Sequence, residues 1–234
     1  MNTFGIIPAR YASTRLPGKP LALIAGKPMI QWVYENASKS KLLEKIIIAT
    51  DDKRIFYAVK DFGGDVVMTN NNHKSGTDRC FEVVEKLSFK DGIIVNIQGD
   101  EPFINALQID KLVALFNDDE VDIATLIHPL HQLEDYENKN RVKVQTDENG
   151  FAKSFSRIDK AAGFLHIGMY AYRTNVLDQL VKLLQTENEI SNSLEQLRWL
   201  DNGYKIKTAL IKETGLSVDT HEDLQKAREI AKAL

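Results

Sequence analysis

Two acidic side chains stand directly behind an apolar run, at the point where a buried strand would end. The run 93–97 leads through Gln98 into Asp100 and Glu101. Side chains at the carboxyl ends of strands line the ligand-binding edge of open α/β sheets. Mg²⁺ usually takes one or two protein carboxylates and completes its octahedron with phosphate oxygens and water. Asp100 is therefore a candidate Mg²⁺ ligand in a phosphate-transfer reaction, and an exposed turn acid is the alternative.

A basic loop follows the first apolar run of the chain, residues 4–7. Arg10, Arg15 and Lys19 lie five and four residues apart in a segment whose Pro and Gly content excludes a continuous helix. These three cations could converge on a triphosphate, because guanidinium groups match phosphate oxygens well. The alternative is a solvated basic loop. The common nucleotide fingerprints, a Walker loop and GxGxxG, are absent from the sequence.

Two further polar segments follow predicted strands. Thr50 and Asp51 precede Asp52, and either aspartate could cap the next helix. The segment HKSGTDR, residues 73–79, offers a glycine for close backbone approach and free N–H groups at a helix start, which suits a polar ligand. A solvated His73 and a simple cap remain alternatives there.

The second half carries polar residues with several possible roles. Arg157 stands just beyond a predicted strand, where its guanidinium could bind a carboxylate or form a surface ion pair. Strand alternation puts His166 and Tyr170 on one face, as a pocket wall or as a hydrogen-bonded core pair. Glu195 lies three residues before Arg198, a spacing that also fits a plain intrahelical ion pair.

Short apolar runs alternate with helix-period stretches in the first half of the chain, the pattern of βαβ units in a parallel sheet. The predicted strands are residues 4–7, 45–49, 65–68 and 92–97. The predicted helices are residues 28–38, 52–62, 77–87 and 106–116. Loops after these strands gather at one edge of the sheet, which places the polar segments together.

After about residue 120 the pattern changes to strands without regular intervening helices, which predicts an inserted smaller mixed sheet. These strands are residues 123–128, 141–145, 151–155 and 166–172. Helices at 174–185 and 193–201, a strand at 205–211 and a helix from His221 complete the prediction. Thr220 and Asp223 form a capping-box variant before that helix. Because no linker-like tract occurs, we expect a single domain over residues 1–234.

Bulk composition narrows the function classes. The chain has 234 residues, 43% hydrophobic and 27% charged, which is ordinary globular composition. A formal net charge of −3 provides no general basic field for nucleic acid or an anionic membrane surface. One cysteine, no zinc-type spacing, no secretory signal and no long apolar run together favour a cytoplasmic protein that does not span a membrane.

The motifs together resemble one enzyme family, from about residue 3 to about residue 230. The opening IPARYASTRLPGKPL followed by GKPMI, then HKSGTDR, VNIQGDEPFI, LEQLR and VDTHEDL, is similar to that of the CMP-Kdo synthetases, or 3-deoxy-manno-octulosonate cytidylyltransferases. FSR and HIGMYAY resemble two further elements of that family. The resemblance implies a Rossmann-like nucleotidyltransferase fold, a largely parallel sheet flanked by helices. It also implies that CTP and Mg²⁺ activate the acidic sugar Kdo for lipopolysaccharide biosynthesis, releasing pyrophosphate.

The resemblance also implies roles for individual residues. Catalysis would involve Arg10, Lys19, Asp100 and Asp219, the two aspartates being the Mg²⁺ ligands. The nucleotide-binding residues would be Pro8, Ala9, Arg10, Arg15, Lys19, Thr50, Asp51, His73, Ser75, Gly76, Thr77 and Gln98, with Arg79 a further candidate. The sugar-binding residues would be Gln98, Arg157, His166, Tyr170, Glu195 and Gln196. Residues 1–120 would bind nucleotide, residues 121–212 would bind sugar and form a homodimer, and residues 213–234 would close the fold.

The chain departs from the family between Arg157 and His166, where typical members carry a longer insertion. The short loop 158–165 bears on the dimer contacts of that segment and on the choice of sugar. A cytidylyltransferase for 8-amino-Kdo or a sialic-acid-like sugar is one alternative. A non-catalytic nucleotide-binding protein of the same fold is another. Activity across nucleotides and acidic sugars separates the three.

Overall fold

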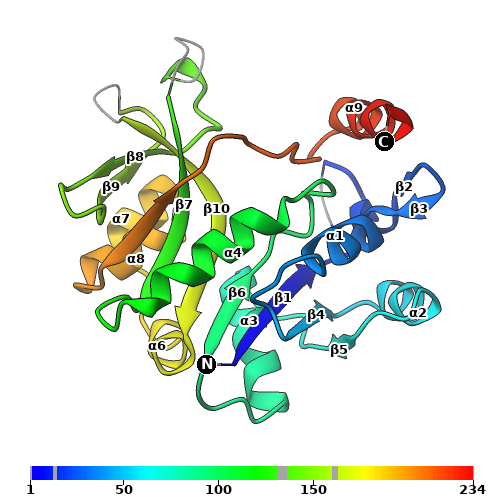
Figure 1. Cartoon of the computed structure of the whole chain (residues 1–234), viewed down its shortest axis with the longest axis horizontal. Helices are drawn as coiled ribbons and strands as arrows, with labels where there is room; N and C mark the ends of the chain where they lie inside the picture. Colours follow the sequence, from blue (N-terminus) through cyan, green and yellow to red (C-terminus); the bar gives the residue numbers. More distant parts are fainter. Residues whose placement is uncertain (1, 13–14, 131–135, 160–162, 234) are drawn as a thin grey trace. The chain divides into compact units, whose positions relative to one another are not determined.

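The chain divides into two compact units, of which the computed structural model describes residues 2–12, 15–130, 136–159 and 163–233 (Figure 1). Unit 1 comprises Met1–Asp110 and Gly215–Leu234, and unit 2 comprises Lys111–Thr214. The chain therefore leaves unit 1 once and returns to it near the C-terminus. No helix in the described ranges is both long and apolar enough to cross a membrane.

Unit 1 contains four parallel strands: β1 (Thr3–Ala9), β4 (Lys45–Thr50), β5 (Val66–Met68) and β6 (Ile93–Asn96). Their order is β6-β1-β4-β5. The strands β4 and β6 are almost continuously buried, as expected for a parallel sheet covered on both faces. Because all four run the same way, the loops after them leave from one edge of the sheet.

Helices connect these strands and pack on them: α1 (Met29–Ala37), α2 (Lys53–Asp61) and α3 (Gly76–Lys86). Each has an apolar stripe at helical spacing; α1, for example, buries Ile30 and Val33. A short helix, η1 (Lys19–Leu21), and a hairpin of β2 (Leu23–Ile24) and β3 (Lys27–Pro28) lie between β1 and α1. The helix α4 (Ala106–Ala114) follows β6.

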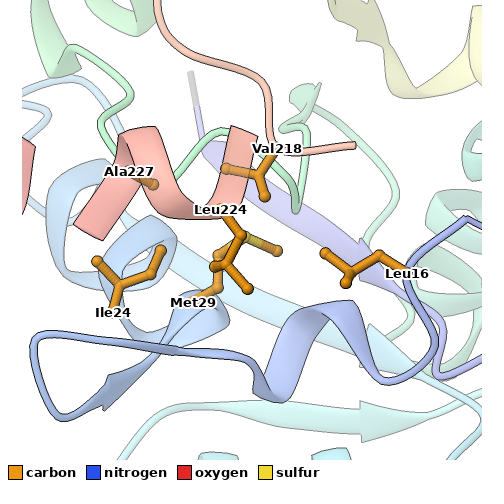
Figure 2. Close-up of a cluster of buried hydrophobic side chains, with 6 residues drawn as sticks. All are labelled: Leu16, Ile24, Met29, Val218, Leu224 and Ala227. Carbon is orange, nitrogen blue, oxygen red and sulfur yellow. The ribbon is translucent and has the colours of Figure 1, made fainter. Parts of the chain in front are cut away.

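The last helix, α9 (His221–Ala233), belongs to unit 1 although it ends the chain. It inserts Leu224 and Ala227 into a buried cluster shared with Val218. Figure 2 shows these side chains meeting those of the β1–α1 region. The cluster consists of Leu16, Ile24, Met29, Val218, Leu224 and Ala227. This packing fixes the segment that carries Asp219.

Unit 2 contains a mixed sheet in the order β11-β7-β10-β8-β9. Its strands are β7 (Ile123–Pro129), β8 (Lys143–Thr146), β9 (Ala152–Ser156), β10 (Phe164–Arg173) and β11 (Ile206–Leu210). Among the described strands of this unit, only β11 and β7 pair in parallel. The described helices of this unit include η2 (Leu115–Asn117), α6 (Thr174–Leu180), α7 (Glu187–Asn192) and α8 (Glu195–Asp201).

The predicted α/β class, with its parallel sheet and smaller mixed sheet, is confirmed. The predicted strands and helices are found within a few residues of their expected bounds, with two differences. The helix predicted over 174–185 ends as α6 at Leu180, and Leu184 beyond it is 88% exposed. A separate helix, α7, follows, with Thr186 as its N-cap. The hairpin β2–β3 was also not predicted, because each strand has only two residues.

Candidate active site

The basic loop after β1 closes on itself. Gly18 adopts a left-handed conformation with φ 69°, and its N–H donates to the Tyr11 carbonyl at 3.0 Å. A Cβ at Gly18 would lie 3.0 Å from the Tyr11 ring, so glycine is needed here on both counts. The guanidinium of Arg54 stacks over the Tyr11 ring, with its Cζ 3.3 Å from the ring centroid. The turn brings Lys19 back toward the end of the sheet.

Asp100 and Asp219 meet at this loop. The Nζ of Lys19 donates to Asp100 Oδ2 at 2.7 Å and to Asp219 Oδ1 at 3.0 Å. Arg15 adds a second cation, with Nη2 3.1 Å from Asp219 Oδ1. The structure thus brings together two carboxylates that are 119 positions apart in the sequence.

Backbone contacts hold both acidic segments. The N–H of Val218 donates to the Asp100 carbonyl at 2.8 Å, which joins the segment before α9 to the turn after β6. In that turn a Cβ on Gly99 would lie 2.8 Å from the Pro8 carbonyl oxygen, so the close approach of the two strand ends requires glycine. The predicted capping pair is also present, because Asp223 N–H donates to Thr220 Oγ1 and Thr220 N–H donates to Asp223 Oδ2.

A cleft of about 460 Å³ opens at this edge of unit 1. It is lined by Pro8, Ala9, Arg10, Ala12, Arg15, Lys19, Pro20, Gly76, Gln98, Gly99, Asp100 and Asp219. Nine of the predicted nucleotide, catalytic or metal residues are therefore in one cavity; Ala12, Pro20 and Gly99 were not predicted individually. Their only sequence signal was membership of the two loops.

Charge in the cleft is balanced around Lys19. Burial lowers the pKa of Lys19, but Asp100 and Asp219 outweigh it, and the net pKa is raised. For Arg10, burial and then the charge of Arg79 lower the pKa. Burial, followed by the charge of Asp100, raises the pKa of Glu101 to about 7. Sequence reasoning gave Glu101 no role, and its burial could not be read from a turn-like segment.

The HKSGTDR segment forms the start of α3. Ser75 is the N-cap, and it forms a capping box with Asp78 rather than leaving that role to Thr77. Gly76 reaches the cleft, while Thr77 is 2% exposed. His73 contacts Glu82 through its imidazole and accepts a hydrogen bond from Arg10 through its carbonyl. The segment thus holds Arg10 at the cleft.

Thr50 and Asp51 already have partners inside unit 1. Thr50 is fully buried and its hydroxyl accepts from the Asp52 N–H at 3.2 Å. Asp51 Oδ2 lies 2.9 Å from Nη2 of Arg79, whose side chain is fully buried. Asp52 caps α2, accepting from the Arg54 N–H at 2.8 Å. A nucleotide contact for Thr50 or Asp51 stays a prediction.

The predicted sugar residues other than Gln98 lie in unit 2. The rings of His166 and Tyr170 are 5.2 Å apart, on the same face of β10, although a bulge between Ile167 and Tyr170 interrupts its regular pairing. Burial, followed by the charges of Tyr172 and Glu195, raises the pKa of Tyr170. The Tyr170 hydroxyl is buried without a hydrogen-bond partner among the described residues. An unpaired buried hydroxyl is rare, which fits a place for a polar ligand.

Arg157 and Gln196 complete that group. The guanidinium of Arg157 donates to the backbone carbonyls of Asn192, Lys139 and Asn140 at 3.3–3.4 Å. Gln196 is 5% exposed on α8. Glu195 lies 3.5 Å from Arg198, which also binds the buried Glu189 at 3.0 Å. A role of these residues in sugar binding stays a prediction.

Comparison with known proteins identifies the family. A family model described as cytidylyltransferase matches residues 4–206. The 3-deoxy-manno-octulosonate cytidylyltransferase of Parabacteroides distasonis is 47% identical over 245 residues, which cover 97% of each chain. The chain belongs to the 3-deoxy-manno-octulosonate cytidylyltransferase family. The Fusobacterium nucleatum member is 46% identical, covering 97% of this chain and 95% of its own.

Solved structures agree with this assignment. A CMP:2-keto-3-deoxy-manno-octonic acid synthetase complexed with CTP is 40% identical, with a TM-score of 0.94 and full coverage of both chains. A putative glucose-1-phosphate thymidylyltransferase from Bacillus anthracis shares 18% identity and a TM-score of 0.71, which shows the common fold alone.

Proposed function

We propose that this cytidylyltransferase transfers CMP from CTP to Kdo, giving CMP-Kdo and pyrophosphate. The anomeric hydroxyl oxygen of the sugar forms a bond to the α-phosphorus as the bond to the pyrophosphate oxygen breaks. The names of the relatives and the CTP complex of the similar synthetase support CTP and Kdo as substrates. The observation that carries the proposal is the convergence of Asp100 and Asp219 on one cation in a cleft lined by Arg10 and Arg15.

The donor set of the cleft fits Mg²⁺. Asp100 and Asp219 offer hard carboxylate oxygens that already share one cation, and Mg²⁺ needs only one or two such groups. No cluster of three or more His, Cys, Asp or Glu suited to a metal occurs within the described ranges, so substrate oxygens and water would complete the coordination. The metal would neutralise phosphate charge and polarise the reacting oxygen.

The protein's own groups would position the phosphates. Arg10 and Arg15 offer guanidinium forks, and Lys19 offers a mobile ammonium, toward the triphosphate. The N-terminus of α3 at Gly76 adds backbone N–H groups at the same cleft. The pyrophosphate leaving group gains negative charge as its bond breaks, and these cations would stabilise that charge. Positioning and charge neutralisation carry most of such a transfer.

In unit 2, the proposed sugar contacts are Arg157, His166, Tyr170, Glu195 and Gln196. The unpaired Tyr170 hydroxyl is the feature that most needs a polar partner there. We also propose that the protein is a cytoplasmic homodimer supplying CMP-Kdo for lipopolysaccharide synthesis. The homodimer follows from the family resemblance, and sedimentation velocity of the purified protein would check it.

Pyrophosphate release tests the proposed function. CTP, UTP and ATP are each paired with Kdo, 8-amino-Kdo and a sialic acid, with Mg²⁺ present or chelated. We expect the highest kcat/KM for CTP with Kdo, and loss of turnover after chelation. Protein that binds CTP but forms no product with any of these sugars would contradict the proposal in favour of a non-catalytic nucleotide-binding protein. A higher kcat/KM with another sugar would move the assignment to that sugar.

Charge-removing variants test the site itself. Asp100→Asn and Asp219→Asn should each lower kcat at least about 100-fold, a usual cost for losing one electrostatic contact to the transition state. Asp65→Asn is the matched control, because Asp65 forms an exposed ion pair with Lys45 elsewhere in unit 1. Circular dichroism establishes that all three variants are folded.

A further inference from the structure

The ammonium of Lys19 stands between the two proposed metal ligands. It donates to Asp100 at 2.7 Å and to Asp219 at 3.0 Å. The side chain of Lys19 is 15% exposed, so the contact is largely shielded from bulk water. Two carboxylates brought this close repel each other unless a cation lies between them. In this structure Lys19 supplies that cation.

Both acidic groups are held by contacts that do not involve Lys19. Val218, next to Asp219, is fully buried in the cluster of Figure 2 and donates its N–H to the Asp100 carbonyl. Leu16 of the basic loop is buried in the same cluster. These apolar and backbone anchors would keep the two carboxylates facing each other when the ammonium moves.

The Lys19 ammonium and a divalent ion cannot both occupy the position between Asp100 and Asp219. A divalent ion bound by Asp100 and Asp219 takes the oxygens that Lys19 now contacts, and repulsion would drive the ammonium out. A lysine ammonium is a point charge on a flexible four-carbon stem, so it can turn toward another anion. The cleft beside it is lined by Arg10, Arg15 and Gly76, the groups suited to phosphate. A nucleotide triphosphate would therefore offer the displaced ammonium a new partner.

We propose that Lys19 occupies the divalent-cation position of the nucleotide-free protein and exchanges Asp100 and Asp219 for the nucleotide phosphates, so that metal binding there depends on nucleotide. This exchange rests on the proposed function, since it assumes a phosphate ligand in the cleft. Lys19 then positions Asp100 and Asp219 before nucleotide binds and contacts phosphate after it has bound. The free protein should bind divalent cations weakly in spite of its two converging carboxylates.

Titration of nucleotide-free protein with Mn²⁺, followed by electron paramagnetic resonance, tests the exchange without turnover. Wild-type protein should bind Mn²⁺ weakly. Lys19→Met should bind it at least about tenfold more tightly, because a competing unit charge has gone. Lys19→Arg keeps the charge and should stay as weak as wild type. Lys27→Met is the matched control, because Lys27 pairs with Glu35 at 2.7 Å elsewhere in unit 1, and its removal should leave Mn²⁺ affinity unchanged.

The double variant Lys19→Met with Asp100→Asn locates the ion, and it should lose the gain in Mn²⁺ affinity. Tight binding by wild type, or equal binding by wild type and folded Lys19→Met, would overturn the exchange. The wild-type titration decides this even if a variant fails to fold. If the protein transfers CMP to Kdo but Lys19→Met does not change the Mn²⁺ affinity, the proposed function stands and the exchange is wrong. If Lys19→Met raises the Mn²⁺ affinity but the protein transfers CMP to none of the sugars, the exchange stands and the proposed function is wrong.

Discussion

At the residue scale, the buried guanidinium of Arg79 shows that several polar residues of the predicted nucleotide-binding loops bind one another inside unit 1. Arg79 is fully buried, and it binds Asp51 at 2.9 Å and the Thr69 hydroxyl. It therefore joins the start of α3 to the segments after β4 and β5. The polar residues of three loops are held in one arrangement by this single side chain.

Arg79→Met should lower the free energy of unfolding by about 3 kcal/mol, because it leaves Asp51 with a partly buried charge and no partner. Arg54→Met is the matched comparison. Arg54 also pairs with an aspartate, Asp52, at 2.6 Å, but its side chain is 59% exposed, so we expect a loss of at most about 1 kcal/mol. Urea unfolding of both variants measures the difference, and equal losses would contradict the structural role of Arg79.

The local roles around Arg79 also mark a limit of sequence reasoning. The cations Arg10, Arg15 and Lys19 and the acid Asp100 could be found from residue type beside a predicted strand. The pairs Arg79–Asp51 and His73–Glu82 could not, because each depends on a contact between separate elements. The meeting of Asp100 with Asp219 came from family resemblance, since no periodicity links positions so far apart.

At the element scale, α9 is the support of one half of the proposed metal site. Leu224 is 5% exposed and packs with Val218 beside Asp219. Capping by Thr220 and Asp223 fixes the start of the helix directly after Asp219. The position of the carboxylate therefore depends on apolar packing one turn away.

Leu224→Ala should lower the free energy of unfolding by about 2–5 kcal/mol, the usual range for such a core truncation. Ile230→Ala on the same helix removes an apolar side chain that is 42% exposed, and should cost clearly less. Thermal or urea unfolding compares them. If α9 were only loosely attached, the two substitutions would have equal effects.

Element boundaries were predictable where packing and local signals agree. The buried runs of β4 and β6 and the helix-period stretches of α1 and α3 show such agreement. Residues 181–185 continue an apolar pattern, yet Leu184 finds no core and is exposed. The T-x-x-E pattern of Thr186 and Glu189 was the available signal for the separate helix α7.

At the scale of the whole molecule, acid stability should depend on His166. The residue retains some exposure, but its ring packs against Phe155 and Tyr170, with centroids 5.2 Å away in each case. Burial lowers the pKa of His166 from 6.5 to about 3. Between pH 6.5 and 3, His166 is therefore protonated in the unfolded chain and neutral in the folded protein. The stabilisation is complete above pH 6.5 and is lost as the pH falls toward 3.

His166→Gln should flatten the dependence of unfolding free energy on pH between 6.5 and 3. One proton taken up on unfolding gives a slope of up to about 1.4 kcal/mol per pH unit. Measurement of both proteins at pH 8 gives the cost of lost packing, which is subtracted. Parallel curves for wild type and variant below pH 6.5 would show that His166 does not titrate in this way.

The discontinuity of unit 1 also affects how the protein is made. The loop of Lys19 and the turn of Asp100 are synthesised early, but Asp219 arrives only after all of unit 2. A nascent chain still held by the ribosome can build the sheet of unit 1 while it lacks the second carboxylate. The proposed transfer would thus be impossible until Asp219 has been synthesised, whatever the order in which the two units fold.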